Sequence, residues 1–309
     1  MLLNSPPITV VVSTNSRGNR IAAAIQTILQ NNYPDFELRV TDQSMDDLAE
    51  ASILSFRSDR RLCYSRAKTT GLSTGRNAAI AASKNEIIAI TDDDCRTPPN
   101  WLRELANAFA VDPRIGMVFG NTHVGPHDPS KGFIPSYIRK EPFLARGIHE
   151  KHLVEGIGAC AGLKKSVWKA LGGFDECLGP GALFRAGDDA DFAIRTLLAG
   201  FYVFETPAFK VDHYGFRTWQ EGRNLIHGYL YGLGAAYAKH LKCRHWPAIL
   251  LLARLAARWA FLHPAVGYGH LPPRGLRLRG FLQGFSRGLF HPVDRVTSRY
   301  ISRPGFGSR

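Results

Sequence analysis

The stretch Glu86-Ile87-Ile88-Ala89-Ile90-Thr91-Asp92-Asp93-Asp94-Cys95 decides the fold of this chain. Residues 86–91 form a short and almost uninterrupted apolar run, which predicts a buried central strand of a parallel sheet. Ligands of open α/β sheets bind beyond the carboxyl ends of such strands, so the three acids are expected at a binding edge. Adjacent carboxylates repel one another, and an all-oxygen ligand set suits Mg²⁺ or Mn²⁺. The stretch therefore predicts a divalent-cation site, with an acidic, solvated loop as the alternative.

The sequence around this stretch alternates between strand and helix patterns. A continuous β-branched run predicts a strand at residues 8–12, a second strand is expected at 36–41, and apolar residues at helical spacing predict a helix over 21–29. Further strands are expected at 62–65, 115–119, 202–205 and 209–213, and further helices at 71–82, 98–110, 166–171 and 192–198. This alternation predicts an α/β fold with a doubly wound, mostly parallel sheet.

Two common nucleotide-binding classes are excluded by the residues after the first strand. Residues 13–18 contain neither Gly-x-Gly-x-x-Gly nor Gly-Lys-Ser/Thr, which argues against a dinucleotide-binding Rossmann enzyme and against a P-loop NTPase.

Residues 125–155 are rich in Pro, Gly and His and show no clear period. Long irregular stretches inside compact domains are usually functional loops, so a loop over the site is expected there.

The composition indicates a globular protein kept on the cytosolic side. The chain has 309 residues and is 45% hydrophobic, enough to bury one large core or a core with an appendage. Its five cysteines are widely spaced and form no Cys-x-x-Cys pair, as expected of reduced thiols. Residues 1–7 lack the basic start of a signal peptide. A cytoplasmic location is therefore the expectation.

The formal net charge of +13 is concentrated near one end of the chain. Residues 240–309 hold 12 of the 39 Lys and Arg residues but only one of the 26 Asp and Glu residues. Such a block points to an anionic surface, either a membrane or a nucleic acid. Nucleic acid is the lesser candidate because no recognised nucleic-acid motif accompanies the charge. Peripheral contact with an anionic membrane, at its cytosolic face, is the expectation.

A membrane-surface helix is predicted from Trp246 to Leu262. Two arginines four residues apart, Arg254 and Arg258, make a bilayer-crossing helix unfavourable, whereas an interfacial helix would place Leu250, Leu251 and Trp259 among the lipids. Beyond an interruption at Pro272-Pro273, a second such segment is predicted from apolar residues interleaved with arginines. The apolar residues are Leu276, Leu278, Phe281 and Phe285, and the arginines are Arg274, Arg277, Arg279 and Arg287. The alternative is a helical subdomain that packs on the core and has a basic outer face.

Several motifs occur in a fixed order along the chain. They are Val40-Thr41-Asp42-Gln43-Ser44-Met45-Asp46-Asp47, Gly71 to Asn77, Thr91-Asp92-Asp93-Asp94, Gly172-Gly173-Phe174-Asp175-Glu176, Gly187-Asp188-Asp189-Ala190-Asp191 and Val211-Asp212-His213. Together they resemble the family 2 glycosyltransferases of the GT-A fold, over residues 8–242. The joint order of the motifs is far more specific than one Asp-x-Asp match.

The resemblance implies roles for the acids after the strands. Thr14 and Asp42 fall where such enzymes hold the base and ribose of the nucleotide. Asp92 and Asp94 match the two acids of the Asp-x-Asp motif, with Asp94 as the direct metal ligand and Asp92 serving ribose or sugar hydroxyls. Asp93 is the variable middle residue and is placed with the nucleotide-sugar site.

The same resemblance implies roles for four further residues. Asp189 matches the catalytic base of the family's Glu-Asp motif, and Asp188 stands where Glu is commoner. Arg76 and Asp188 are assigned to the nucleotide-sugar site. His213 matches a late histidine that completes the metal and diphosphate site with a Mg²⁺ or Mn²⁺ ion. The implied division is a GT-A catalytic domain, residues 1–215, followed by a helical, basic C-terminal extension, residues 216–309.

The implied chemistry explains why these residue types are needed. Sugar transfer from a nucleotide-diphosphate sugar develops negative charge on the departing diphosphate, which a divalent cation stabilises. A carboxylate can take the proton of the attacking acceptor hydroxyl, and a single displacement inverts the anomeric configuration. A UDP-sugar donor is the family expectation, with GDP- and dTDP-sugars open, and attachment to a membrane would favour a lipid-linked acceptor. A metal-dependent nucleotidyltransferase and an inactive sugar-nucleotide-binding module are the alternatives.

Overall fold

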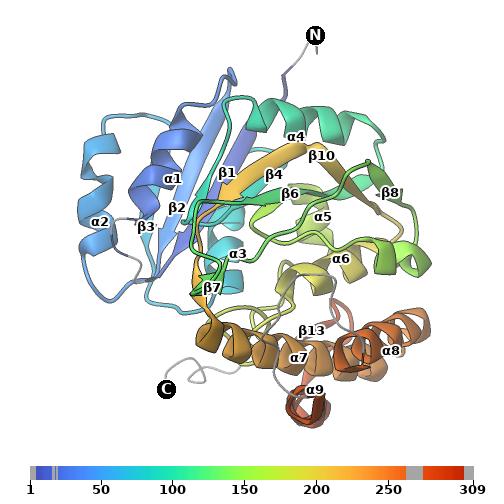
Figure 1. The fold of residues 1–309 in the computed structure, drawn as a ribbon. Coiled ribbons are helices and arrows are strands. Elements are labelled where there is room, and N and C mark those ends of the chain that lie inside the picture. The colour runs from blue at the N-terminus through green and yellow to red at the C-terminus, as the bar shows by residue number, and fades with distance from the viewer. Residues whose placement is uncertain (1–4, 16–17, 19, 262–273, 303–309) are drawn as a thin grey trace.

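The computed structural model describes residues 5–15, 18, 20–261 and 274–302. It confirms the predicted α/β fold, with a nine-stranded mixed sheet between two layers of helices and additional helices from the C-terminal part of the chain. Figure 1 shows these C-terminal helices together at one end of the molecule, below the sheet in that view.

The first half of the sheet is parallel, as predicted. Its strands are β1 (Ile8–Thr14), β2 (Phe36–Asp42), β3 (Leu62–Arg66) and β4 (Ile87–Thr91), in the spatial order β3-β2-β1-β4. Because all four run in the same direction, the residues after β1, β2 and β4 lie at one edge of the sheet. This edge carries Thr14, Asp42 and the acids that follow Thr91.

The second half of the sheet is mixed. Strand β9 (Cys160–Lys164) runs antiparallel to both of its neighbours, β4 and β6 (Ile115–Val124). Strand β6 pairs in parallel with β10 (Tyr202–His213). The sequence predicted two strands where the structure has the single strand β10. The pairing of β10 with β6 is interrupted by a shift of register between Thr206 and Lys210 and then continues to His213.

Strand β10 also brings distant segments to the binding edge. Its end pairs with β5 (Cys95–Arg96), which places His213 opposite Cys95, the residue directly after the three acids. Its start pairs with β8 (Phe143–Ala145). One strand thus joins the acidic stretch to the second half of the sheet.

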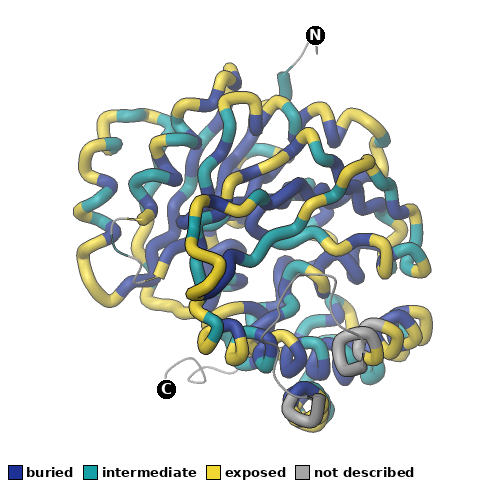
Figure 2. The backbone as a smooth tube through the Cα atoms, viewed as in Figure 1, coloured by how far each residue is buried: buried dark blue, intermediate teal, exposed yellow. Residues whose placement is uncertain are grey.

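Alternation of side chains along the strands explains the two helical layers. Ile8, Val10 and Val12 point into one apolar cluster, whereas Val11 points into the other. The first cluster is covered by α1 (Arg20–Leu29), α2 (Leu48–Ile53) and α4 (Trp101–Ala110), and the second by α3 (Leu72–Ala82), α5 (Lys165–Ala170) and α6 (Asp188–Leu198). A short 3-10 turn, η1 (Leu54–Phe56), follows α2. Figure 2 shows the resulting buried strands at the centre of the molecule.

The stretch 125–155, expected to be a loop, contains short regular elements. These are β7 (Gly132–Phe133), β8 and the 3-10 helix η2 (Ile148–Leu153). The buried carboxylate of Glu205 anchors the stretch, since it accepts hydrogen bonds from the Tyr137 hydroxyl at 2.8 Å and from the backbone N–H of Gly156 at 2.7 Å. Strand β7 pairs with β11 (Arg217–Thr218).

The C-terminal part forms three helices and a small hairpin. They are α7 (Trp219–Lys242), α8 (Trp246–Phe261), α9 (Arg274–Phe290), β12 (Val293–Asp294) and β13 (Arg299–Tyr300). Helices α7 and α9 approach closely at glycines: a Cβ atom on Gly284 would lie 1.9 Å from the carbonyl oxygen of Tyr231, and one on Gly234 would lie 2.1 Å from that of Phe281. The predicted boundary between residues 215 and 216 falls between β10 and β11.

The interfacial placement predicted for two of the apolar residues of α8 is only partly compatible with the structure. Leu251 is buried inside the protein, in a cluster with Ala248 and Ile194, whereas Leu250 is 68% exposed. The side chain of Trp259 lies outside the described residues, as do Leu262 and the Pro272-Pro273 interruption. Among the helices of the described residues, none is long and apolar enough to cross a bilayer.

The second predicted membrane segment, in α9, also faces the protein in part. The ring of Phe285 lies 5.5 Å from that of Tyr237 on α7, and Phe281 contacts the same tyrosine at 6.0 Å. Leu278 is 40% exposed. The amphipathic pattern therefore reflects packing on α7 as well as an exposed face.

Candidate active site

The three acids after β4 turn to three different elements. Asp93 accepts a hydrogen bond from the Thr14 hydroxyl at 2.6 Å, and Asp92 accepts one from Nη2 of Arg76 at 2.9 Å. Asp94 Oδ1 lies 3.3 Å from Nε2 of His213. The consecutive carboxylates thereby connect β1, α3 and β10 at one edge of the sheet.

His213 is oriented for metal binding by a hydrogen bond on its other nitrogen. Nδ1 lies 2.7 Å from the carbonyl oxygen of Pro135, to which it donates, so in the neutral ring Nε2 carries the lone pair that a cation could bind, and in the protonated ring Nε2 donates to Asp94. Burial alone would lower the pKa of His213, but the hydrogen bond and charge of Asp94 outweigh burial and raise the pKa above its ordinary value. A cation and a proton therefore compete for the same nitrogen.

The space beside these two side chains is kept open by Gly215. A Cβ atom there would lie 2.4 Å from Nε2 of His213 and 2.8 Å from Oδ2 of Asp94. Asp94, Cys95 and His213 form the one group of metal-ligating side chains found in the described part of the chain. A thiolate is a soft ligand that Mg²⁺ and Mn²⁺ bind less well than oxygen and nitrogen, which leaves Asp94 and His213 as the ligands for such an ion. These residues fit a Mg²⁺ or Mn²⁺ ion whose remaining ligands come from a substrate.

Arg76 holds two predicted donor-site acids together. Its side chain is 3% exposed, and besides Asp92 it contacts Asp188 Oδ2 at 3.2 Å through Nη1. Burial, followed by the charge of Asp189, raises the pKa of Asp188 to about 7, although Arg76 acts in the opposite direction. One guanidinium thus bridges the acid that ends the central strand and the acid that begins α6.

Asp189 is the least buried of the three acids at the start of α6. Asp188 and Asp191 are buried, whereas Asp189 is half-buried. Its Oδ2 accepts a hydrogen bond from the backbone N–H of Gly158 at 2.8 Å. The carbonyl oxygen of the same glycine accepts from Nη2 of Arg76 at 3.2 Å. Gly158 therefore holds Asp189 beside Arg76 and the two acids that Arg76 bridges.

Thr14 and Asp42 lie next to each other where β1 and β2 end. They are paired in register across the two strands, and Asp42 is fully buried. Asp42 accepts hydrogen bonds from the Tyr64 hydroxyl at 2.7 Å and from the backbone N–H of Ser44 at 2.8 Å. All the predicted site residues thus lie at one edge of the sheet, in three groups. Asp94 belongs with His213, Asp92 with Arg76 and the acids of α6, and Asp93 with Thr14 and Asp42.

Asp191 points away from this site into a buried ion network. It contacts Arg195 Nε at 2.9 Å and Lys239 Nζ at 2.7 Å, and Lys239 also binds Asp175 at 2.6 Å. Burial alone would raise the pKa of Asp191, but Lys239 and Arg195 outweigh burial and hold it well below its ordinary value. Burial lowers the pKa of His240, which contacts the same carboxylate. The network joins the helix that begins with Asp188 and Asp189 to α7.

The sequence motifs did not identify several residues that shape the site. These are Tyr64, Pro135, Gly158, Gly215 and Lys239. Pro135 and Gly158 act through backbone atoms, which no side-chain pattern reveals. Gly215, two positions after His213, is the one residue of this set whose type could have indicated its role, because glycine is needed where other groups approach the backbone closely.

Sequence comparison assigns a family profile to more than half of the chain. The profile of Glycosyl transferase family 2 matches residues 9–172. The uncharacterized protein y4gI of Sinorhizobium fredii is 27% identical over 234 residues, which cover 68% of this chain and 24% of that protein. A glucosyl-dolichyl phosphate glucuronosyltransferase of Haloferax volcanii is 25% identical over 201 residues, or 59% of this chain and 58% of that protein. The chain thus spans less than two thirds of the length of these curated relatives.

Comparison with solved structures extends the likeness to almost the whole chain. The mannosyltransferase PcManGT from Pyrobaculum calidifontis, solved in complex with GDP-Man and Mn²⁺, superimposes with a TM-score of 0.60. The match covers 96% of this chain and 79% of that one at 18% sequence identity. At this level of identity the likeness shows a shared fold.

Proposed function

Because this chain belongs to glycosyl transferase family 2, we propose that it transfers a sugar from a nucleotide-diphosphate sugar to an acceptor hydroxyl, with inversion of the anomeric configuration. One observation carries the proposal. A metal-binding pair, Asp94 and His213, and a candidate base, Asp189, lie at the same sheet edge as the Arg76-linked acids Asp92 and Asp188. Donor binding and proton removal, the two requirements of the reaction, therefore have separate groups in one place.

Asp94 and His213 are proposed to hold the donor's metal ion. Gly215 leaves room beside both ligand atoms, and Pro135 fixes the imidazole with Nε2 toward Asp94. When bound there, a Mg²⁺ or Mn²⁺ ion neutralises charge on the departing diphosphate as a Lewis acid.

The donor nucleotide and sugar are proposed to lie along the groups between β1 and α6. Thr14 and Asp42, adjacent at the ends of β1 and β2, would bind the base and ribose. Asp92 and Asp188, joined by Arg76, would bind ribose or sugar hydroxyls. Asp93 is proposed to act through its hydrogen bond to Thr14, which keeps the threonine in place.

Asp189 is proposed to take the proton of the acceptor hydroxyl. A base must remain accessible to the acceptor, and Asp189 meets this condition better than its buried neighbours Asp188 and Asp191. Its hydrogen bond from Gly158 orients the carboxylate without neutralising it. A single base on one side of the sugar supports one displacement and therefore inversion.

The substrates proposed are a UDP-sugar donor and a lipid-linked acceptor. The Haloferax volcanii relative carries a dolichyl phosphate in its name, which supports an acceptor of this kind. The basic C-terminal part, residues 240–309, supports peripheral contact with an anionic membrane at its cytosolic face.

A donor screen tests the proposal. Purified protein is incubated with Mn²⁺ or Mg²⁺ and with UDP-, GDP- and dTDP-sugars, and release of nucleoside diphosphate is measured with and without a prenyl-phosphate-linked sugar. We expect metal-dependent release of nucleoside diphosphate from one donor class. Release of pyrophosphate instead would identify a nucleotidyltransferase, and donor binding without any release would identify an inactive binding module.

A further inference from the structure

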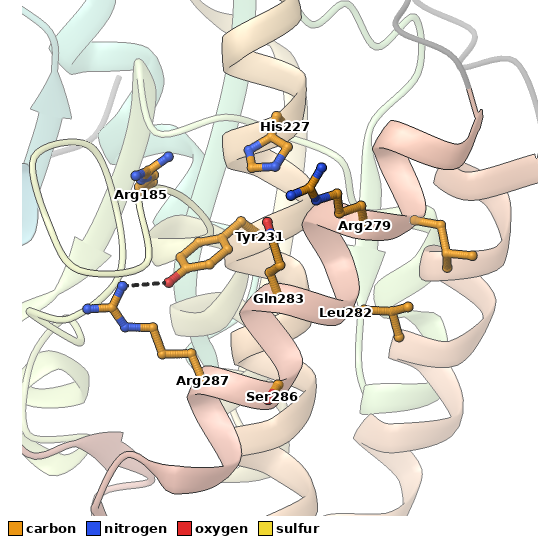
Figure 3. Close-up of a pocket in the computed structure, with 9 residues that line it drawn as sticks. Arg185, His227, Tyr231, Arg279, Leu282, Gln283, Ser286 and Arg287 are labelled. Carbon is orange, nitrogen blue, oxygen red and sulfur yellow. Dashed lines mark hydrogen bonds between the residues drawn. The ribbon is translucent and has the colours of Figure 1, made fainter.

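A cleft outside the proposed donor site opens between α7, α9 and the loop that leads into α6. It has a volume of about 950 Å³, within the usual range for ligand sites. Its lining residues are Arg185, His227, Tyr231, Leu278, Arg279, Leu282, Gln283, Ser286 and Arg287. Figure 3 shows Arg185 and Arg287 on either side of Tyr231, with Arg279 next to His227.

The cleft gathers positive charge without a neutralising acid. Arg287 donates a hydrogen bond to the Tyr231 hydroxyl at 3.2 Å, and the guanidinium of Arg185 lies 5.5 Å from the centre of the same ring. The lining contains three arginines and no carboxylate, and within the described ranges no ion pair involves Arg185, Arg279 or Arg287. Guanidinium groups without a carboxylate partner present paired donors to a phosphate or another oxyanion.

The backbone at Arg185 is held in a costly conformation. Its φ of +64° lies in the left-handed region, which residues other than glycine adopt rarely and which is often retained at functional sites. The loop is fixed on α7 as well, since a Cβ atom on Gly232 would lie 2.5 Å from the carbonyl oxygen of Ala186. Arg185 is therefore presented by a strained and tightly packed turn.

This turn places the cleft close to the proposed base. Arg185 precedes Asp189 by four residues, which span at most about 14 Å even when fully extended. A ligand with a phosphate near Arg185 could therefore reach Asp189 with a hydroxyl of an attached sugar.

The cleft also has an apolar side. Leu278 and Leu282 are 40% and 54% exposed and line it from α9. In Figure 3 Leu282 lies across α9 from the guanidinium groups of Arg185 and Arg287. A ligand that combines an anionic head with an aliphatic chain would satisfy both sides at once.

We propose that this cleft binds the acceptor through a phosphate group, with Arg185 and Arg287 holding the phosphate and Leu278 and Leu282 contacting an aliphatic chain. The inference rests on the proposed function and specifies its acceptor as an aliphatic phosphate ester. The acceptor's sugar then extends toward Asp189.

The test measures binding of octyl phosphate to the full chain by calorimetry, without donor and below the micelle concentration. We expect octyl phosphate to bind at least about tenfold more tightly than either octanol or inorganic phosphate, which each lack one half of the ligand. Arg185→Gln and Arg287→Gln should each raise the Kd about tenfold, the effect of losing one charge-assisted hydrogen bond. Arg223→Gln, an exposed arginine of α7 outside the cleft, is the matched control and should leave the Kd unchanged.

Three results would overturn the inference. The first is absence of octyl phosphate binding, and the second is equal Kd values for the native chain and the Arg185 and Arg287 variants. The third is capture of phosphatidylglycerol vesicles that is weakened by Arg185→Gln as octyl phosphate binding is, which would make the cleft a bilayer contact. Donor binding with Mn²⁺, measured on the same samples, separates the two proposals. If the donor binds and octyl phosphate does not, the acceptor cleft is wrong and the donor site stands, and the reverse result rejects the donor site alone.

Discussion

At the scale of single residues, Asp94 and His213 depend on each other and on the gap beside them. Asp94→Asn keeps the shape and removes the charge, so we expect Mn²⁺-dependent donor binding to be lost in calorimetry. Gly215→Ala should weaken it too, because the added Cβ would lie 2.4 Å from Nε2 of His213. The exposed neighbour Asp212 supplies the control, since Asp212→Asn should bind metal and donor as the native chain does. Unchanged affinity in Asp94→Asn would remove this residue from the metal site.

Asp189 offers a test of proton removal. Asp189→Asn preserves the hydrogen bond from Gly158 but cannot accept the acceptor's proton. Turnover should fall by about 10²- to 10⁴-fold while the Kd for donor stays the same, because a general base acts on the rate of the chemical step. Steady-state kinetics and calorimetry on the same protein separate the two effects. Full turnover in Asp189→Asn, together with its loss in Asp188→Asn, would assign the base to Asp188.

Asp188 gives the stability a definite pH dependence. Its pKa, 3.8 ordinarily, is raised to about 7 by burial and by Asp189, so the folded chain keeps a proton that the unfolded chain has already lost. A raised pKa contributes stability that is complete below the unfolded value and is lost as the pH rises through the folded value. We expect the contribution of Asp188, measured in urea as the difference in free energy of unfolding between the native chain and Asp188→Asn, to decrease from about pH 4 to 7. Parallel pH profiles for both proteins would contradict this.

The sequence identified most of these side chains because each follows a recognisable strand or begins a helix. The triplet Asp92 to Asp94 comes directly after an apolar run, and the acids of α6 stand together at its first turn. Pro135 could not be identified in this way, because its role depends on a carbonyl group that meets His213 across 78 residues.

At the scale of elements, the contact between α7 and α9 depends on the absence of side chains. Gly284→Ala would bring a Cβ to 1.9 Å from the Tyr231 carbonyl, so the helices must separate, at a cost of about 1–3 kcal/mol or more. Gly228→Ala is the matched change in α7, where the nearest atom is 3.8 Å away, and it should be neutral or stabilise by up to about 1 kcal/mol. Urea unfolding of both variants measures the difference. Equal stabilities would mean that the helices adjust freely.

Element types were easier to predict than element partners. The strands predicted at 8–12 and 36–41 were both found, as β1 and β2. The merging of two predicted strands into β10, and its pairing with β5 and β8, depends on contacts between residues far apart in sequence. Local patterns carry no information on such pairing.

At the scale of the whole molecule, membrane contact is open to a direct measurement. Trp246 and Leu250 are 61% and 68% exposed on α8, so among the described side chains of this helix they are apolar ones that could enter a lipid surface. Trp246→Ser combined with Leu250→Ser should reduce co-sedimentation of the full chain with phosphatidylglycerol vesicles at low salt. Leu54→Ser, an exposed leucine in η1, is the control. Equal sedimentation of all three proteins would exclude attachment through α8.

Truncation near Lys242 would be a poor version of this experiment. The hydroxyl of Tyr300 donates to the carbonyl of Ala235 at 2.6 Å, and its backbone N–H donates to Asp175 at 2.9 Å. Removing the residues after 242 would therefore uncover α7 and disturb the turn before α6. The basic composition of this part was plain from the sequence, but its integration with the catalytic core depends on buried contacts that composition does not specify.

The buried network around Lys239 has a consequence for the making of the protein on the ribosome. Asp175 is synthesised 64 residues before Lys239 and 125 residues before Tyr300, two of its partners. At about 5–20 residues per second, the carboxylate of Asp175 waits about 3–13 s for its ammonium partner and about 6–25 s for the backbone amide. Once residue 213 has been added, the nascent chain contains every proposed donor ligand, yet the helix that begins with Asp188 and Asp189 still lacks the ammonium group of Lys239 beside Asp191. The chain therefore completes this ion network late in translation, and a ribosome stalled between these points would carry the proposed donor ligands without the charge of Lys239 beside α6.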